Sequence, residues 1–176
     1  GLIAEPNWVS KVQNGEEEIL RKCISCNVGC AGNRIGVNRP IRCTVNPAVP
    51  EGDIYKKLKV NKNCNVVVVG GGTAGLEAAC ILKQRGHQPV VYEASDELGG
   101  QFVTAGKAPR KMEMKDAALS YGEKAKRLGI LIHLNTPVDA SLITEGSWDE
   151  VILAIGAEPI HLSIPGAERE NVYNSH

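Results

Sequence analysis

Four cysteines near the N-terminus have the residue type and spacing needed to hold iron. Cys23, Cys26, Cys30 and Cys43 form a C-x2-C-x3-C-x12-C run. Thiolates are the usual ligands of iron–sulfur clusters, and three bunched ligands with a distant fourth let one loop hold three corners of a cluster. Structural zinc more often takes two paired C-x2-C hairpins. The spacing favours an iron–sulfur cluster, with a zinc site or unligated thiols as the alternatives.

The surroundings of this run are basic, which suits a negatively charged four-thiolate centre. The flanking cations are Arg21, Lys22, Arg34, Arg39 and Arg42. The two other cysteines, Cys64 and Cys80, fall at a predicted strand start and inside a predicted helix. We interpret both as small buried apolar residues.

A second chemical signal is a G-x-G-x-x-G turn made by Gly70, Gly72 and Gly75. It lies directly between a predicted strand and a predicted helix, where backbone N–H groups can receive a diphosphate. Glu93 ends the next predicted strand and can accept hydrogen bonds from a ribose diol. Its charge would repel a 2′-phosphate, which disfavours NADP at this site. The alternative is a glycine-rich turn that binds nothing.

NAD and FAD share an ADP half, so this turn alone does not separate them. The residues Leu98-Gly99-Gly100-Gln101 place a second glycine pair shortly after Glu93, where a loop could run beside the pyrophosphate. That feature favours FAD. An ordinary surface turn is the alternative, because glycine is common in turns.

Alternating apolar patterns predict an α/β fold with a Rossmann-like parallel sheet. Strands are expected at 66–69, 89–92, 130–134 and 151–155, with helices at 73–85 and 114–128. We divide the chain into a tail at 1–22, a loop-rich cysteine segment and connector at 23–60, and the first half of an FAD-binding domain at 61–176. The tail is expected to be non-helical at Pro6 and helical around 16–21.

Composition excludes several partner classes. The 176 residues carry no net charge and only 4% aromatic residues, so nothing favours nucleic acid or an anionic membrane. No apolar stretch is long enough to span a bilayer. We expect a cytoplasmic protein, because clustered thiols suit a reducing compartment. None of the four histidines lies in a nucleophile pattern, so we predict no catalytic residue in this chain.

The order of LIAEPNW, CISCNVGC, CTVNPA, VVVVGGGTAGLEAA, VVYEASDELGGQ and DEVILAIGAEP resembles the NADH:flavin oxidoreductases, which include 2,4-dienoyl-CoA reductase, 2-enoate reductase and trimethylamine dehydrogenase. The resemblance covers nearly the whole chain. It implies a longer polypeptide in which electrons pass from NAD(P)H through FAD and a [4Fe-4S] cluster to FMN in a (β/α)8 barrel, where an activated C=C bond is reduced. The barrel and the NAD(P)H-binding region of that polypeptide are the expected partners, and this piece alone is expected to be inactive.

The resemblance also assigns roles to residues. The cluster ligands would be Cys23, Cys26, Cys30 and Cys43, and the cofactor-binding residues would be Gly70, Gly72, Ala74, Gly75, Glu93, Gly100, Gln101, Val138, Ala154 and Gly156. Ile155 stands where the family has Thr. In the trimethylamine dehydrogenase branch the same pocket resembles one that holds ADP, so a non-redox ADP module and a zinc-stabilised nucleotide-binding module stay open as alternatives.

Overall fold

The chain folds around a four-stranded parallel sheet with strand order β3-β2-β1-β4. The computed structural model describes residues 1–50, 52, 60, 62–158, 160 and 162–173. The strands are β1 (Asn65–Val69), β2 (Gln88–Tyr92), β3 (Leu131–His133) and β4 (Glu150–Leu153). The predicted α/β class and parallel sheet are thus confirmed, with each strand within two residues of its expected bounds.

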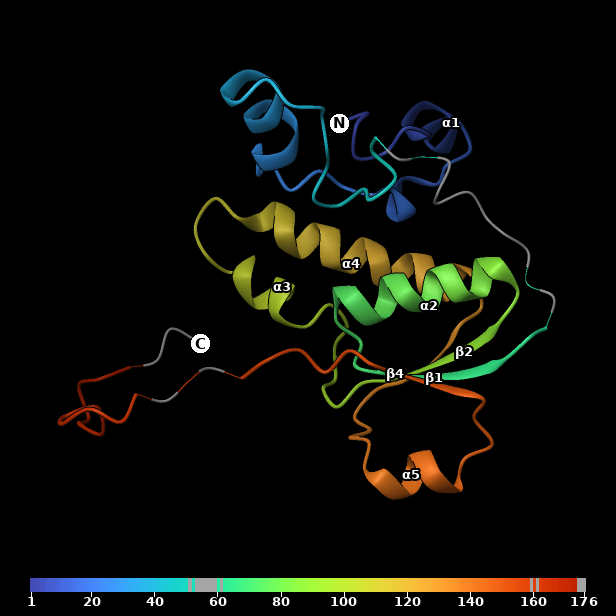
Figure 1. The fold of residues 1–176 in the computed structure, drawn as a ribbon, viewed down its shortest axis with the longest axis vertical. Coiled ribbons are helices and arrows are strands. Elements are labelled where there is room, and N and C mark those ends of the chain that lie inside the picture. Colours follow the sequence, from blue (N-terminus) through green and yellow to red (C-terminus); the bar gives the residue numbers. More distant parts are fainter. Residues whose placement is uncertain (51, 53–59, 61, 159, 161, 174–176) are drawn as a thin grey trace.

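One face of the sheet is covered by α2 (Thr73–Arg85), α3 (Gln101–Ala105) and α4 (Met112–Arg127), as Figure 1 shows. Val66 and Val68 of β1 point to this side and pack with Leu76 of α2 in the main core. Cys80 is fully buried there, as predicted, whereas Cys64 is only half-buried at the margin of the core. Gly86 ends α2 with a φ of 106°, a conformation that glycine adopts without strain.

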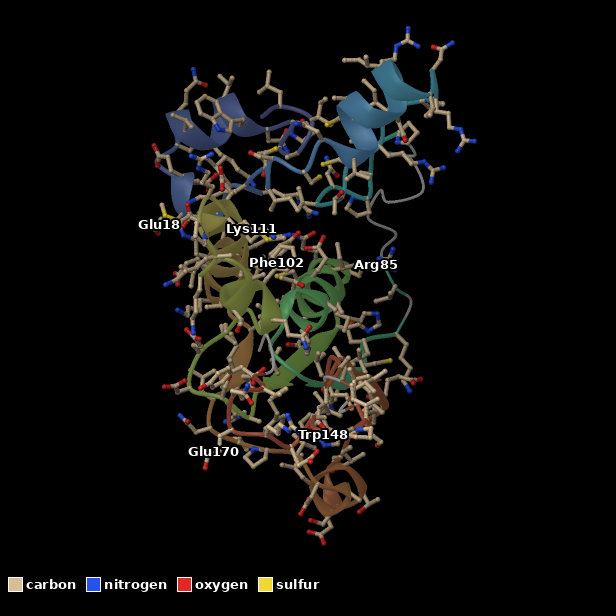
Figure 2. All side chains as sticks on the ribbon, turned by 90° about the vertical axis from the view of Figure 1, so that its left-hand side faces the viewer. Glu18, Arg85, Phe102, Lys111, Trp148 and Glu170 are labelled. Carbon is tan, nitrogen blue, oxygen red and sulfur yellow. The ribbon has the colours of Figure 1, made fainter. Side chains whose placement is uncertain are left out.

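The opposite face is less covered. The helix α5 (Ala140–Glu145) lies on that side, and Trp148 lies beneath the sheet next to it in Figure 2. Tyr92 stacks on His133 at 4.7 Å between ring centroids and meets Trp148 edge-on. Leu153 stays 66% exposed, although parallel sheets usually bury both faces.

The N-terminal region forms a separate layer over α2 and α4. It contains α1 (Trp8–Gln13), a 3-10 turn η1 (Glu17–Ile19) and a π-helical segment η2 (Val28–Gly36). The expectation of a helix around 16–21 was met by only one 3-10 turn. The helix α1 was missed because Pro6 precedes it rather than interrupting it, and proline breaks a helix only in its interior. The loop prediction for 23–60 missed η2, and residues 51 and 53–59 of the connector lie outside the described residues.

Candidate functional site

A cavity of about 530 Å³ opens where the carboxyl ends of β1, β2 and β4 meet. This is the edge at which open parallel sheets bind ligands. Nine of the ten residues predicted to bind a cofactor line it: Gly70, Gly72, Ala74, Glu93, Gly100, Gln101, Val138, Ala154 and Gly156. The structure therefore brings together residues that lie far apart in the sequence.

The tenth residue, Gly75, lies just behind the cavity and sets its shape. A Cβ on Gly75 would stand 2.0 Å from the carbonyl oxygen of Gly70. Gly70 has a φ of 106°, and a Cβ there would stand 2.3 Å from the carbonyl oxygen of Ala154. These two glycines therefore let α2 pack tightly against β1 and β4 at the turn.

Gly72 differs from its neighbours because a Cβ there would meet no atom within 4 Å. It caps α2 without any side-chain hydrogen bond. The first-turn N–H groups of a helix have no intrahelical partner, and the helix dipole makes this end electropositive. The open space beside Gly72 thus fits a bound diphosphate.

Glu93 is held in a fixed orientation by backbone donors. Its Oε2 accepts from the N–H of Gly71 at 2.6 Å, and its Oε1 accepts from the N–H of Ser95 at 2.8 Å and from the Ser95 hydroxyl at 2.9 Å. The carboxylate joins the glycine turn to the end of β2 and lines the cavity. Its remaining acceptor capacity can receive ribose hydroxyls.

The second glycine pair completes the site. Gly99 bridges to Gly72 and donates its N–H to the carbonyl of Gly71 at 2.9 Å. The side chain of Gln101 reaches across to the carbonyl of Ala157 at 2.6 Å. The loop is therefore not an ordinary surface turn, because it pairs directly with the G-x-G-x-x-G turn.

Several lining residues were not predicted from the sequence. They include Phe102 on α3, Thr136 and Pro137 after β3, and Ile155 after β4. The position of 136–137 directly after a predicted strand was the available signal, since strand ends in such folds contribute to ligand sites. Phe102 offered no comparable signal, because α3 has only five residues.

The four predicted cluster ligands also come together. Cys23, Cys26, Cys30 and Cys43 all line one small cavity of about 20 Å³, together with Gly29, Thr44 and Val45. The first two cysteines are exposed and the last two are half-buried. Among the described residues, no group of three or more Cys, His, Asp or Glu side chains is arranged to hold a metal ion.

Gly29 explains how the distant fourth cysteine reaches the other three. A Cβ on Gly29 would stand 2.7 Å from the carbonyl oxygen of Arg42, and the N–H of Arg42 donates to the carbonyl of Gly29 at 2.7 Å. This close backbone contact places the residues before Cys30 beside the residue before Cys43. Only glycine permits such an approach without movement of the backbone.

Hydrogen bonds to sulfur are present at two of the thiols. The N–H of Ser25 donates to Cys23 Sγ at 3.4 Å, and Cys26 Sγ lies 3.3 Å from the Thr44 hydroxyl. The Thr44 hydroxyl and the N–H of Val28 lower the pKa of the Cys26 thiol below its usual value. The contacts of Cys26 thus favour its thiolate form, which is the form that binds metals.

The two histidines in the described part of the chain line neither of the two cavities. His87 accepts a hydrogen bond from the N–H of Cys64 at 3.2 Å, and His133 stacks on Tyr92. These contacts of His87 and His133 are with residues of the sheet domain. His161 and His176 lie outside the described residues.

None of the described helices is long and apolar enough to cross a membrane.

Comparison with known families gives one match. The family described as "Pyridine nucleotide-disulphide oxidoreductase" matches residues 64–176, which contain the whole glycine-lined cavity. The cysteine segment lies outside that match.

Individual relatives extend over the cysteine segment as well. The chain is 43% identical over 176 residues to "NADH oxidase" of Thermoanaerobacter brockii, which covers 98% of this chain and 27% of that protein. It is 34% identical over 168 residues to "Cinnamate reductase" of Clostridium sporogenes, covering 96% of this chain and 25% of that protein. The chain thus spans about a quarter of the length of these relatives.

Among solved structures, a complex of 2-naphthoyl-CoA reductase superposes on this chain with a TM-score of 0.92 at 31% sequence identity. The match covers 99% of this chain and 26% of that one. Because the match covers 99% of this chain, the described part of the N-terminal layer belongs to the shared fold as well as the sheet. The resemblance to NADH:flavin oxidoreductases inferred from the sequence is confirmed.

Proposed function

Because the chain belongs to the pyridine nucleotide-disulphide oxidoreductase family, we propose that it is the FAD- and cluster-holding part of a flavin-dependent reductase. When bound, FAD and a [4Fe-4S] cluster would carry electrons from NAD(P)H toward FMN held elsewhere in the same polypeptide. The residues of this chain bind and orient these groups. They contribute no catalytic acid or base of their own.

The observation that carries the proposal is the fit of the glycine-lined cavity to a dinucleotide. The diphosphate would lie in the open space beside Gly72, facing the uncapped N-terminus of α2. The fixed carboxylate of Glu93 would receive the adenosine ribose, and the loop at Gly100 and Gln101 would continue toward the flavin. With about 530 Å³, the cavity has room for the ADP half.

The cysteine cavity supports the second part of the proposal. All four thiols line it, and a [4Fe-4S] cluster takes four cysteine thiolates. The run of three bunched cysteines with a distant fourth favours an iron–sulfur cluster over the zinc alternative.

The substrate class follows from the relatives. Cinnamate reductase and 2-naphthoyl-CoA reductase are named for substrates with conjugated unsaturation. We therefore propose that the complete polypeptide reduces an activated C=C bond, of the enoate or dienoyl-CoA kind, in a barrel outside this chain. The barrel and the NAD(P)H-binding region would be the partners of this chain, and this chain alone would not turn over substrate. We also propose a cytoplasmic location, because clustered thiols suit a reducing compartment.

A non-redox ADP module is the second candidate. It is favoured by the positions of Gly72 and Glu93, which would hold only the diphosphate and the adenosine ribose of the ADP half. Extraction of the nucleotides bound to the purified full-length protein, followed by chromatography, separates the two, because FAD, ADP and the FMN of the barrel are each identified by elution and absorbance. Colourless ADP in place of FAD would contradict the redox proposal.

The relay itself is tested with Cys30→Ser in the full-length protein under anaerobic conditions. We expect the wild type to bind four irons and four sulfides per chain. In the variant, NADH should still reduce FAD at the wild-type rate, while reduction of FMN should slow by at least about 100-fold. Stopped-flow absorbance separates the two steps.

Cys64→Ser is the matched control, because Cys64 lies at the margin of the sheet core and outside the cysteine cavity. It should leave iron content and both flavin reduction rates unchanged. Unimpaired FMN reduction in Cys30→Ser, or stoichiometric zinc in the wild type, would overturn the cluster part of the proposal without affecting FAD binding.

A further inference from the structure

A partly buried ion network lies between the cysteine segment and the helices α2 and α4. The guanidinium of Arg21 donates through Nη1 to the carbonyl of Val45 and through Nη2 to Glu77 Oε1 at 2.7 Å. Val45 lines the cysteine cavity and follows the fourth cysteine by two residues. Glu77 lies on α2. One side chain therefore joins the segment of the fourth cysteine to the helix that begins at the diphosphate site.

The helix α4 completes the network from the other side. The Tyr121 hydroxyl also donates to the Val45 carbonyl, at 3.4 Å, and the Arg21 guanidinium lies 5.8 Å from the centroid of the Tyr121 ring. Lys124 lies 3.6 Å from Glu77 Oε2. The Arg21 and Glu77 side chains are only 18% and 22% exposed. Removing one partner of an ion pair that is largely shielded from solvent costs more stability than removing one partner of an exposed pair.

Arg21 is itself held in place from the N-terminal side. The buried carboxylate of Glu5 accepts from the backbone N–H of Arg21 at 3.1 Å and from Lys11 Nζ at 2.6 Å. The next residue after Val45, Asn46, is also buried and donates its amide to the carbonyl of Ile3 at 2.9 Å. The segment 43–46 is thus fixed from two sides rather than by its own secondary structure.

We propose that Arg21 is a positioning residue that fixes the fourth cysteine ligand against α2 and α4 and raises the reduction potential of the centre held by the four cysteines. This inference rests on the proposed cluster. A reduced cluster carries one more negative charge than an oxidised one, so a nearby cation favours the reduced state. The network holds three cations, Arg21, Lys124 and Lys11, against the two carboxylates of Glu77 and Glu5, so it carries a net positive charge. Arg21 contacts the segment that carries Cys43 and Val45.

The test compares Arg21→Gln, Arg21→Lys and the wild type in the full-length protein, by redox titration of the cluster followed by electron paramagnetic resonance. In Arg21→Gln the ratio of reduced to oxidised cluster at a fixed potential should fall about tenfold, which is 59 mV for a one-electron couple. Cluster loss to an iron chelator should also become several-fold faster. Arg21→Lys keeps the positive charge, so its reduction potential should equal that of the wild type. Lysine lacks the planar guanidinium that donates to both the Val45 carbonyl and Glu77, so cluster loss should stay faster than in the wild type.

Arg127→Gln is the matched control. Arg127 also joins α4 to the N-terminal region, through Glu18 at 3.0 Å, and Figure 2 shows Glu18 at the side of that layer. The Arg127–Glu18 ion pair is exposed, and neither residue lines the cysteine cavity. Arg127→Gln should therefore leave both the reduction potential and the rate of cluster loss unchanged. Wild-type potential and chelation rate in Arg21→Gln would overturn the inference, as would equal shifts in Arg127→Gln. A wild type without a cluster would instead overturn the proposed function.

Discussion

The two cavities of this chain are built in different ways. The glycine-lined cavity, proposed above to hold a dinucleotide and called the dinucleotide cavity below, is formed by the ends of three hydrogen-bonded strands and the start of α2. At its turn, Gly70 and Gly75 pack against backbone atoms. The cysteine cavity is formed by a π-helical segment and loops, and none of η2 is buried. Side chains from other elements hold it in place, chiefly Arg21 and Tyr121.

This difference indicates which site is shaped before its ligand binds. The diphosphate space is fixed by the packing of the sheet core, so it should persist in the empty protein. The cysteine cavity has two exposed thiols and little apolar burial of its own, so much of its order should come from the group it binds, as in other metal-dependent segments. Variants in the two regions should therefore have different effects on stability and on ligand binding.

The largest effect on stability is expected from Gly75→Ala. The new methyl group would overlap the Gly70 carbonyl, only 2.0 Å away, inside a backbone contact that cannot relax easily. We expect the free energy of unfolding to fall by about 3 kcal/mol, the upper end for overpacked sites. Urea denaturation followed by circular dichroism measures it. A loss below roughly 0.5 kcal/mol would show that the turn is looser than described.

Gly72→Ala should separate binding from folding within the same turn. Its φ of −72° suits alanine and no atom lies within 4 Å of the new methyl group, so stability should change by less than about 0.5 kcal/mol. The methyl group would occupy the space of the diphosphate. ADP affinity should therefore fall roughly 100-fold, or ~2.8 kcal/mol. Isothermal titration with ADP measures this loss, and unchanged affinity would place the diphosphate elsewhere.

Glu93→Gln should give a smaller effect on the same cavity. The amide keeps one oxygen for Gly71 or Ser95 but loses the charge that strengthens bonds to ribose hydroxyls. ADP affinity should fall about tenfold, or ~1.4 kcal/mol. The free energy of unfolding should fall by about 1 kcal/mol, because one of the two backbone N–H groups loses its acceptor. The same titration with 2′-phosphorylated ADP provides the contrast, since its binding should weaken less or improve.

Glu5→Gln tests the N-terminal layer through its pH dependence. Burial acts to raise the pKa of Glu5, but hydrogen bonds from Lys11 and the Arg21 backbone lower it below 4.5 overall. A lowered pKa means that Glu5 stabilises the fold above about pH 4.5 and that this contribution is lost as the pH falls through its folded pKa. The variant should lose ~1 kcal/mol at pH 7 and show a flatter acid profile.

The readout for Glu5→Gln is the fluorescence of Trp8 in urea, in a Trp148→Phe background that removes the only other tryptophan. The ADP affinity of the dinucleotide cavity should stay constant, because Glu5 lies in the other layer. A parallel acid profile in wild type and variant would mean that Glu5 does not hold Arg21 in solution.

The sheet domain was the more predictable region for a physical reason. The helix at 73–85 matches its expected bounds, because a β-branched strand, a glycine turn and a terminal glycine all specify the same boundaries. In contrast, α1 buries no residue, so no apolar period marked it. The contacts of Arg21 with Val45 and Glu77 join elements far apart in the chain, and no local pattern encodes them.

The strand order also determines when the dinucleotide cavity is complete. Asn65 at the start of β1 is joined to Asp149 before β4 across 84 residues, and the wall made by 154–156 follows only after β4. Closing so long a loop is slow compared with forming a local helix. During synthesis on the ribosome, we therefore expect FAD to bind only after β4 has emerged and paired, so flavin availability should affect the last step of domain folding and not its nucleation.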